Sequence, residues 1–255
     1  MSNIKIHEYK KKDLENALVI VSFPTIGLVS SIVANFIVTN MKLELIAGIV
    51  SDDFYPAAII QDGIPTPPVR IFAGDNVCGP EDECDQIVVI ASELPIRTQA
   101  FSPLADKIIE WCTEKKGKII TSIEGVNTND PLGDEVAVFH VASTPEASNK
   151  LKDLPSKPFD TGMVSGLSGI LLYKGNIQNV GVSCLLAEAH AEYPDSRSAA
   201  EVLKVLDKML PQIKMDPEPL LKEAEAIEER IKNAMTQVKP LTPAELPDSP
   251  QGMYR

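Results

Sequence analysis

The sequence predicts an α/β domain with three layers, in which helices cover both faces of a mixed sheet. Three observations support this prediction. Short, almost wholly apolar segments recur along the chain, as expected for strands buried inside a sheet. Amphipathic segments of helical length lie between several of these strands. The strand-like segments between Leu43 and Ala91 follow one another closely, which indicates antiparallel hairpins within the same sheet.

The first predicted strand is Ala17–Phe23, and Ile26–Val38 predicts a helix after a turn at Pro24 and Thr25. A second helix is predicted over Phe101–Lys116, where the apolar residues fall on one face, and a third over Ala199–Leu210, which carries a broad apolar stripe. The other predicted strands are Leu43–Val50, Ala57–Ile60, Val69–Ala73, Gln86–Ala91, Lys118–Ile123, Val136–Val141 and Val180–Leu186.

The composition limits the kinds of partner and location. Hydrophobic residues make up 44% of the 255 residues, which is typical of a globular protein. The net charge of −12 disfavours binding to nucleic acid. No apolar segment approaches the roughly 20 residues needed to cross a bilayer, and the first residues contain no apolar signal core. We therefore expect a cytoplasmic protein without a membrane partner.

The four cysteines and three histidines predict neither a metal site nor a bound cofactor. Cys78, Cys84, Cys112 and Cys184 match no zinc-binding spacing, and the histidines do not cluster with them. Cys78 and Cys84 flank a short acidic loop, and a small disulfide between them is one interpretation. Free thiols are the favoured expectation in a reducing cytoplasm.

The composition changes after the predicted domain, residues 1–210. Residues 211–238 are rich in Glu, Lys and Ala and predict an amphipathic helix. Its apolar residues recur at alternating spacings of four and three: Leu220, Ala224, Ile227, Ile231, Ala234 and Val238. The apolar stripe must be buried, either against the parent domain or against the same helix of another subunit.

The tail segment, residues 239–255, contains four prolines and is expected to be extended, with a reach of at most about 56 Å. It ends in Met253, Tyr254 and Arg255, so a hydrophobic side chain, a tyrosine and the terminal carboxylate lie together. Capture of a terminal carboxylate is a standard mode of peptide recognition. A frayed end without a partner is the alternative interpretation.

Two segments resemble parts of catalytic sites, but a structural interpretation is favoured for both. Gly162–Gly169 is rich in glycine like a phosphate loop but lacks the Lys-Ser/Thr ending, so its glycines more plausibly allow close helix packing. Glu124 and Asp130 are candidates for an acid/base pair, but the Asn, Asp and Gly residues of this segment favour a turn.

Polar residues also follow two of the predicted strands. Arg97, near Glu93 and Gln99, is placed where α/β proteins bind anions, although a surface loop is the favoured interpretation. His190, with Glu188 as its partner, is a candidate general base, although a structural role is favoured. No candidate nucleophile accompanies them, so the sequence shows no catalytic constellation.

Three segments together resemble the proteasome assembly chaperone family, specifically its archaeal members related to the second eukaryotic assembly chaperone. They are LVIVSFPTIGLVSSIVANFIV at 18–38, GMVSGLSGILL at 162–172 and LLAEAHAEYPDSRSAAEVLKVLDKML at 185–210. The third is the most specific, because a strand leads through Tyr193-Pro194-Asp195 into a helix that opens with Ala199 and Ala200. The resemblance covers roughly residues 15 to 210.

This resemblance implies a fold similar to nucleoside phosphorylases, used as a protein-binding scaffold and not as an enzyme. The last three residues look like the hydrophobic-tyrosine-any tail of proteasome activators and some assembly chaperones. That likeness implies that Met253 enters an apolar groove between neighbouring α subunits of the core particle. Tyr254 would pack its ring and hydrogen-bond through its hydroxyl, and the Arg255 carboxylate would pair with a lysine.

Two hypotheses follow from the sequence and its resemblance. The first is a chaperone or adaptor, expected to be a homo-oligomer, that binds the α subunits of the proteasome core particle through several tails at once. The alternative is a nucleoside-phosphorylase-like enzyme that acts on a small phosphorylated or nucleoside substrate with Arg97, Glu124 and His190. The enzyme hypothesis predicts a deep pocket in which polar groups converge.

Overall fold

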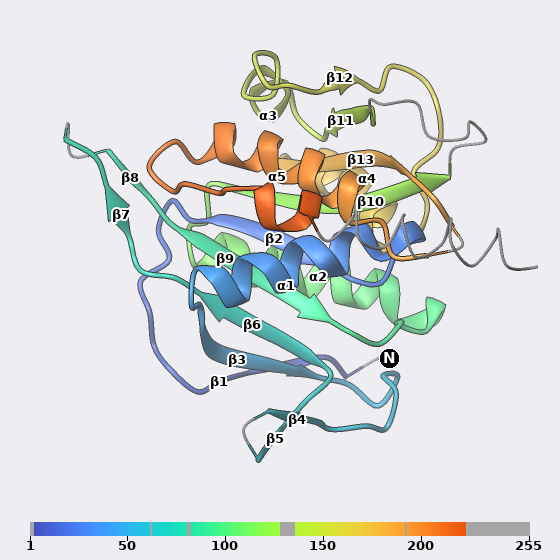
Figure 1. Cartoon of the computed structure of the whole chain (residues 1–255). Helices are drawn as coiled ribbons and strands as arrows, with labels where there is room; N and C mark the ends of the chain where they lie inside the picture. The colour runs from blue at the N-terminus through green and yellow to red at the C-terminus, as the bar shows by residue number, and fades with distance from the viewer. Residues whose placement is uncertain (1–2, 62, 81–82, 128–135, 192, 223–255) are drawn as a thin grey trace, which may run out of the picture.

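The computed structural model describes residues 3–61, 63–80, 83–127, 136–191 and 193–222 (Figure 1). Nine strands form one sheet: β1 Lys5–Glu8, β2 Leu18–Ser22, β3 Glu44–Val50, β6 Val69–Ala73, β9 Ile87–Ser92, β10 Ile119–Asn127, β11 Val138–Ala142, β12 Lys157–Pro158 and β13 Val182–Ala189. Their order across the sheet is β1-β3-β6-β9-β2-β10-β13-β11-β12.

The sheet is mixed, as predicted. The central strands β9, β2, β10 and β13 run parallel to one another, whereas β1, β3 and β6 join them through antiparallel pairs. Of the strands predicted between Leu43 and Ala91, β3, β6 and β9 are antiparallel neighbours in the sheet, whereas the segment predicted at Ala57–Ile60 lies outside it. All five residues of β2 and of β6 are buried, which explains why these segments are almost wholly apolar.

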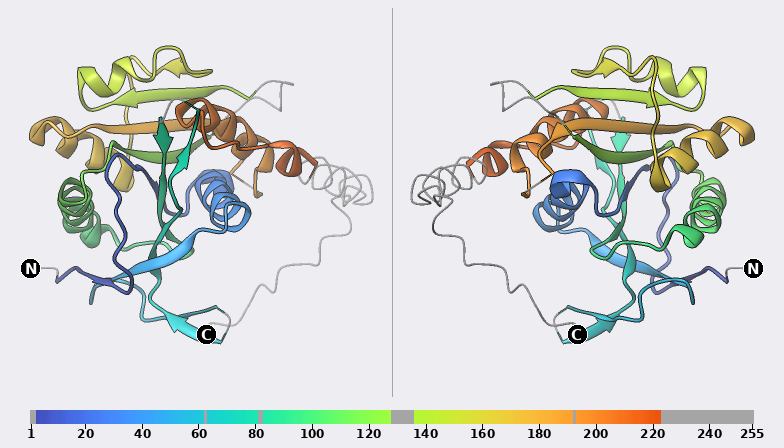
Figure 2. Two further views of the ribbon diagram at one scale, coloured as in Figure 1. Left: turned by 90° about the vertical axis from the view of Figure 1, so that its left-hand side faces the viewer. Right: turned by 90° about the vertical axis from the view of Figure 1, so that its right-hand side faces the viewer.

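Helices cover both faces of this sheet (Figure 2). The 3-10 turn η1 Ile26–Leu28 leads into α1 Val29–Asn40, which packs with α5 Ser196–Met209 on one face. Helices α2 Thr98–Glu114 and α4 Gly166–Gln178 pack together on the other face. A short helix, α3 Pro145–Asn149, follows β11. The predicted three-layer α/β/α arrangement is therefore confirmed.

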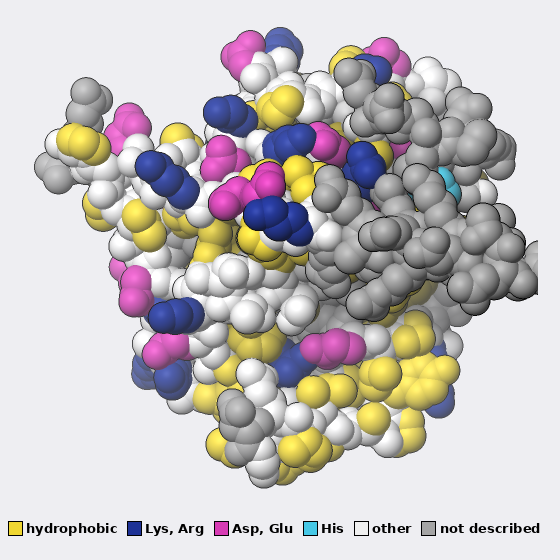
Figure 3. All heavy atoms as spheres, in the orientation of Figure 1, with side chains coloured by type: hydrophobic (Ala, Val, Ile, Leu, Met, Phe, Trp, Pro, Cys, Tyr) yellow, Lys and Arg dark blue, Asp and Glu magenta, His cyan; other side chains and the backbone are white. Residues whose placement is uncertain are grey.

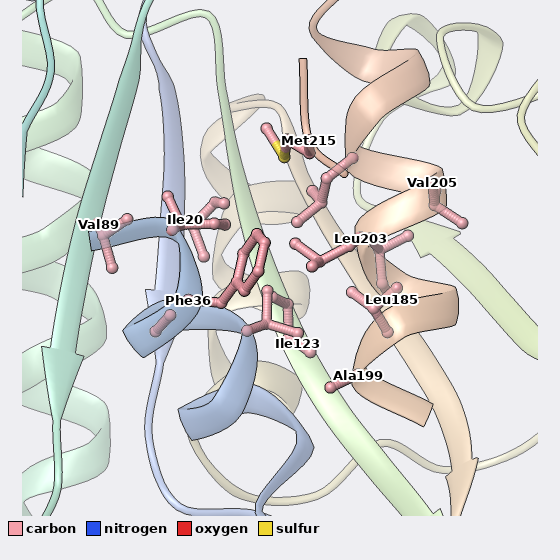
Figure 4. Close-up of a cluster of buried hydrophobic side chains, with 14 of the residues drawn as sticks. Ile20, Phe36, Val89, Ile123, Leu185, Ala199, Leu203, Val205 and Met215 are labelled. Atoms are coloured by element: carbon pink, nitrogen blue, oxygen red, sulfur yellow. The ribbon is translucent and has the colours of Figure 1, made fainter. Parts of the chain in front are cut away.

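Two hydrophobic clusters fill the spaces between the layers. Alternate residues of β2 point to opposite faces, so Leu18 and Ile20 join the cluster under α1 and α5, while Val19 and Val21 join the other. Figure 4 shows the first cluster, with Phe36 of α1 among side chains of the sheet and α5. None of the helices in the described part of the chain is long and apolar enough to span a membrane.

The segment after α5 also contributes to the first cluster. Ile213, Met215 and Leu220 are buried there, with Leu220 5% exposed. Leu220 is the first apolar residue of the predicted amphipathic helix, and it packs on the parent domain. The rest of that predicted helix, from Ala224 to Val238, lies outside the described residues, as does the tail segment.

Two small hairpins lie outside the main sheet. β4 Ile59–Gln61 pairs with β5 Ile64–Thr66, and β7 Val77–Cys78 pairs with β8 Cys84–Asp85. The expectation of free thiols at Cys78 and Cys84 is wrong, because the two residues form a disulfide. The pairing of β7 with β8 places these cysteines directly opposite each other, which the spacing along the sequence did not reveal.

The predicted turn at Glu124–Asp130 is also wrong over its first half. β10 continues as far as Asn127, because Glu124 to Asn127 pair with residues 186 to 189 of β13. This local sequence of Gly, Val and Asn favours a turn, but pairing with a long neighbouring strand keeps it extended. Asp130 lies outside the described residues.

Candidate functional site

The loops after the parallel strands β2, β10 and β13 are the place where α/β proteins commonly bind ligands. In this protein the loop 24–28 occupies that place. The oxygen of Gly27 accepts a hydrogen bond from Asp195 N at 2.7 Å, and Thr25 Oγ1 accepts one from Gly125 N at 3.4 Å. The loop is thereby attached to the ends of both β10 and β13.

Two glycines make this close approach possible. A Cβ on Gly125 would lie 2.1 Å from the backbone oxygen of Ile26, and a Cβ on Gly27 would lie 3.0 Å from the backbone oxygen of His190. Gly27 also has a φ of +61°, which favours glycine. The backbone of loop 24–28 therefore occupies part of the crevice that a ligand would otherwise enter, and a cavity of about 160 Å³ remains there.

Asp195 connects the end of β13 to the beginning of α5. Its Oδ1 accepts a hydrogen bond from Ser198 N at 2.9 Å, as an N-cap does, and its Oδ2 accepts one from His190 N at 3.1 Å. The carboxylate is also 3.0 Å from His190 Nδ1. These contacts give a structural reason for the Tyr-Pro-Asp turn that carries the family resemblance.

We expect Asp195→Ala to lower the free energy of unfolding by about 2 kcal/mol, because it removes the N-cap of α5 and leaves buried donors without a partner. Asp195→Asn keeps an oxygen for Ser198 N and should recover part of this loss. Urea denaturation followed by circular dichroism measures both variants. Equal stability of the alanine variant and the natural chain would contradict this role.

His190 and Glu188 have structural roles, as favoured from the sequence. The His190 ring stacks on Tyr193, with ring centroids 5.0 Å apart, and hydrogen-bonds to Asp195. Glu188 accepts a hydrogen bond from Ala137 N at 3.3 Å. Arg97 lies elsewhere, before α2, with its Cζ 5.7 Å from the centroid of the Tyr55 ring.

Glu124 lies in a small cavity near the beginning of α4. Ser168 Oγ donates a hydrogen bond to Glu124 Oε1 at 2.6 Å, and burial raises the pKa of Glu124 to about 7. The cavity measures about 160 Å³, and its lining residues include Met163, Val164 and Leu186 but neither Arg97 nor His190. The structure therefore does not bring together the three residues on which the enzyme hypothesis depends.

The raised pKa of Glu124 predicts how stability changes with pH. Because the folded pKa exceeds the ordinary value of 4.5, stability is greatest below that value and falls as pH rises through about 7. Glu124→Gln should remove this dependence and raise the free energy of unfolding at pH 8 by up to about 3 kcal/mol. Urea denaturation at several pH values measures the effect. A glutamine variant with the same slope as the natural chain would contradict it.

Two glycines of 162–169 allow close local contacts, but these contacts are with nearby residues of the chain and not with a neighbouring helix, as the sequence had favoured. α4 begins at Gly166, and a Cβ on Gly169 would lie 2.1 Å from the backbone oxygen of Val164. A Cβ on Gly162 would lie 2.3 Å from the ring of Phe159. Within the described ranges, no group of three His, Cys, Asp or Glu side chains is placed to hold a metal ion.

An apolar surface is the clearest candidate for a binding function in the described part of the chain. It is formed by loop 51–58, hairpin β4–β5 and Leu28 of η1, and its large exposed side chains are Leu28, Tyr55, Ile60 and Ile64. Figure 3 shows hydrophobic side chains gathered over the lower part of this face, where the hairpin lies. Exposed apolar patches of this kind mark interaction sites.

A groove of about 460 Å³ opens beside this surface, between α1 and β4, with β6 and β9 at its base. Leu28 lies at one end of the groove in a left-handed conformation, with φ +49°, and is 42% exposed. A strained backbone at an exposed hydrophobic residue is a recognised sign of a functional position. Sequence reasoning missed this surface, because Ile60 and Ile64 look like ordinary strand residues.

The predicted docking residues Met253, Tyr254 and Arg255 lie outside the described residues. Their role remains a prediction from the sequence.

Comparisons with known proteins place the chain among archaeal relatives. It is 32% identical over 237 residues to uncharacterized protein MJ0106 of Methanocaldococcus jannaschii, covering 93% of each chain. Its structure resembles Pyrococcus furiosus PbaA, described as an archaeal homolog of proteasome-assembly chaperone, with a TM-score of 0.78, 29% identity and 92% coverage of each chain.

A second solved structure, PbaB of Pyrococcus furiosus, is described as an archaeal proteasome activator. It has a TM-score of 0.78 but only 20% identity, with 92% of this chain and 100% of that chain covered, so it supports the fold alone. Residues 19–235 match the PAC2 family, which includes most of the described domain. The chain therefore belongs to the PAC2 family.

Proposed function

We propose that this PAC2 protein binds the proteasome core particle, with the α/β domain as a scaffold and the tail segment as the docking element. The observation that carries the proposal is the likeness to PbaA over 92% of both chains, because PbaA is described as a homolog of proteasome-assembly chaperone. The partly occupied crevice agrees with this role, since loop 24–28 takes up much of the space where a substrate would bind.

The tail segment supplies the chemistry for docking in this proposal. Met253 provides an apolar side chain, Tyr254 an aromatic ring with a hydroxyl, and Arg255 the terminal carboxylate. A carboxylate that meets a lysine in a partly desolvated pocket forms a charge-assisted hydrogen bond. One such contact is weak, so the proposal includes a homo-oligomer that presents several tails to neighbouring α subunits.

Binding is tested with the full chain and purified core particle of the same organism. Native mass spectrometry should detect a complex of the two, and light scattering of the chain alone should give the mass of an oligomer. Salt should weaken the complex, because charge-assisted contacts are screened. If the core particle shows no complex at any concentration of the chain, the proposal is contradicted.

A further inference from the structure

The groove between α1 and β4 contains a buried cation with unused hydrogen-bonding capacity. Arg70 of β6 lines the groove and is only 4% exposed. Its Nη1 donates to Gln61 Oε1 at 3.2 Å, and its Nη2 is paired with Glu93. Its Nε has no hydrogen-bond partner among the described residues. A buried donor without a partner is costly, so it indicates that a ligand completes the site.

A second unpartnered group lies in the same groove. Ser31 Oγ of α1 is buried and has no partner within the described part of the chain. A guanidinium and a hydroxyl can both donate to a carboxylate, which accepts several hydrogen bonds. The two groups therefore favour an acidic ligand.

The charges and the apolar lining further define this ligand. Arg70 and Glu93 are the charged side chains among the lining residues. The Glu93 side chain is 55% exposed. Water can therefore hydrate its carboxylate if an incoming carboxylate weakens the ion pair between Arg70 and Glu93. Ile32, Ile60 and Phe72 present apolar surface. The groove thus fits a peptide segment in which a carboxylate lies next to a bulky apolar side chain.

We propose that this groove binds Ala244–Asp248 of the same chain. This segment reads Ala-Glu-Leu-Pro-Asp, so the Glu245 carboxylate would accept hydrogen bonds from Arg70 Nε and Ser31 Oγ, and Leu246 would contact the apolar lining. The neighbouring prolines favour an extended backbone, which suits an open groove between a helix and a strand.

The chain leaves the described part of the structure on the groove's side of the sheet. Leu220 belongs to the same hydrophobic cluster as Phe72, which also lines the groove. A helix over residues 223–238 at about 1.5 Å per residue, followed by six extended residues at about 3.3 Å each, spans roughly 45 Å. This span exceeds the radius of gyration of roughly 17 Å expected for the domain. The segment can therefore reach the groove.

Proteolysis of the full chain tests the proposal. Endoproteinase Glu-C cleaves after Glu245, and mass spectrometry follows the initial rate at which residues 246–255 are released from chains not yet cut after Glu223, Glu225, Glu228 or Glu229. Tethering gives an effective concentration near millimolar, so a site with a dissociation constant of about 0.1 mM protects the bond about tenfold. Asn35→Trp fills the groove from an exposed position of α1, and Arg70→Met removes the cation. Both variants should accelerate the cleavage about tenfold.

The matched control is Gln99→Trp, at an exposed position of α2 on the other face, which should leave the rate unchanged. Hydrogen exchange of the full chain gives a second measurement that leaves the groove residues intact. Glu245→Gln should accelerate amide exchange in β4 and in the first turns of α1.

Equal cleavage rates in the natural chain and Asn35→Trp, together with unchanged exchange in Glu245→Gln, would overturn the proposal. Protection that disappears on about a hundredfold dilution would overturn the contact within one chain, because it would show that the segment of another copy is bound. Groove variants that weaken core-particle binding without changing cleavage would overturn it in favour of a peptide from that partner.

Discussion

Deletion of Met253, Tyr254 and Arg255 is expected to reduce the affinity of the full chain for the proteasome core particle by at least about a hundredfold. The deletion removes the apolar anchor and the aromatic ring from every tail, and it moves the terminal carboxylate to Gly252. If several tails bind together, the loss multiplies across the oligomer, as the gain by avidity would. Biolayer interferometry with immobilised core particle measures the change.

Single substitutions separate the parts of this contact. Arg255→Ala keeps the terminal carboxylate and should retain most of the affinity, because the last side chain is the variable position of the motif. Tyr254→Ala should lose about tenfold or more, since Tyr is a frequent anchor residue in binding pockets. Addition of one glycine after Arg255 moves the carboxylate and should act like the deletion. Full affinity in the deleted chain would exclude the tail as the docking element.

Gly125→Ala is expected to lower the free energy of unfolding by about 3 kcal/mol, a large loss for the addition of a single methyl group. The new Cβ would lie 2.1 Å from the backbone oxygen of Ile26, so either loop 24–28 or β10 must move. For a domain of this size, a loss of about 3 kcal/mol lowers the Tm by roughly 6–12 °C. Differential scanning calorimetry measures the shift.

Two other glycines serve as controls for this variant. Gly181→Ala places its Cβ 3.7 Å from Ala147 Cβ, an ordinary contact, and should change stability little. Gly63 has a φ of +77° but no atom within 4 Å of a new Cβ, so Gly63→Ala measures the backbone cost alone, about 1 kcal/mol. A Gly125→Ala variant as stable as Gly181→Ala would show that loop 24–28 moves without cost.

The layering of the domain could be predicted from sequence because burial on both faces leaves a strong pattern. The wholly apolar β2 and the one-sided helix α2 are examples, and both lie within a few residues of their predicted positions. The short edge strands β1 and β12 were not predicted. β1 has four mostly polar residues and β12 has two, so neither shows a hydrophobic periodicity that could be recognised in the sequence. The strand Glu124–Asn127 was missed because its neighbour β13, distant in sequence, keeps it extended.

The candidate site was less predictable, because its important features depend on contacts between distant segments. The geometry gives His190 a hydrogen-bond partner in Asp195 and Gly169 a close contact with Val164, neither of which the sequence identified. Nothing in the sequence near Arg70 indicates that it would be buried or would line the same groove as Ser31, since the two residues come from a strand and a helix that are far apart in sequence. The disulfide was missed for the same reason, as hairpin pairing and not spacing brings the two cysteines together.

The position of loop 24–28 has a consequence for the discovery of chemical inhibitors. Compounds that resemble nucleosides or phosphates are usually screened against the crevice at the carboxyl ends of the parallel strands. In this protein the backbone between Gly27 and Gly125 takes up part of that crevice, and the cavity of about 160 Å³ beside Glu124 is the space that remains there. The larger groove beside α1 is the better target, and an acidic, peptide-like compound bound in it would compete with Ala244–Asp248 for the same site.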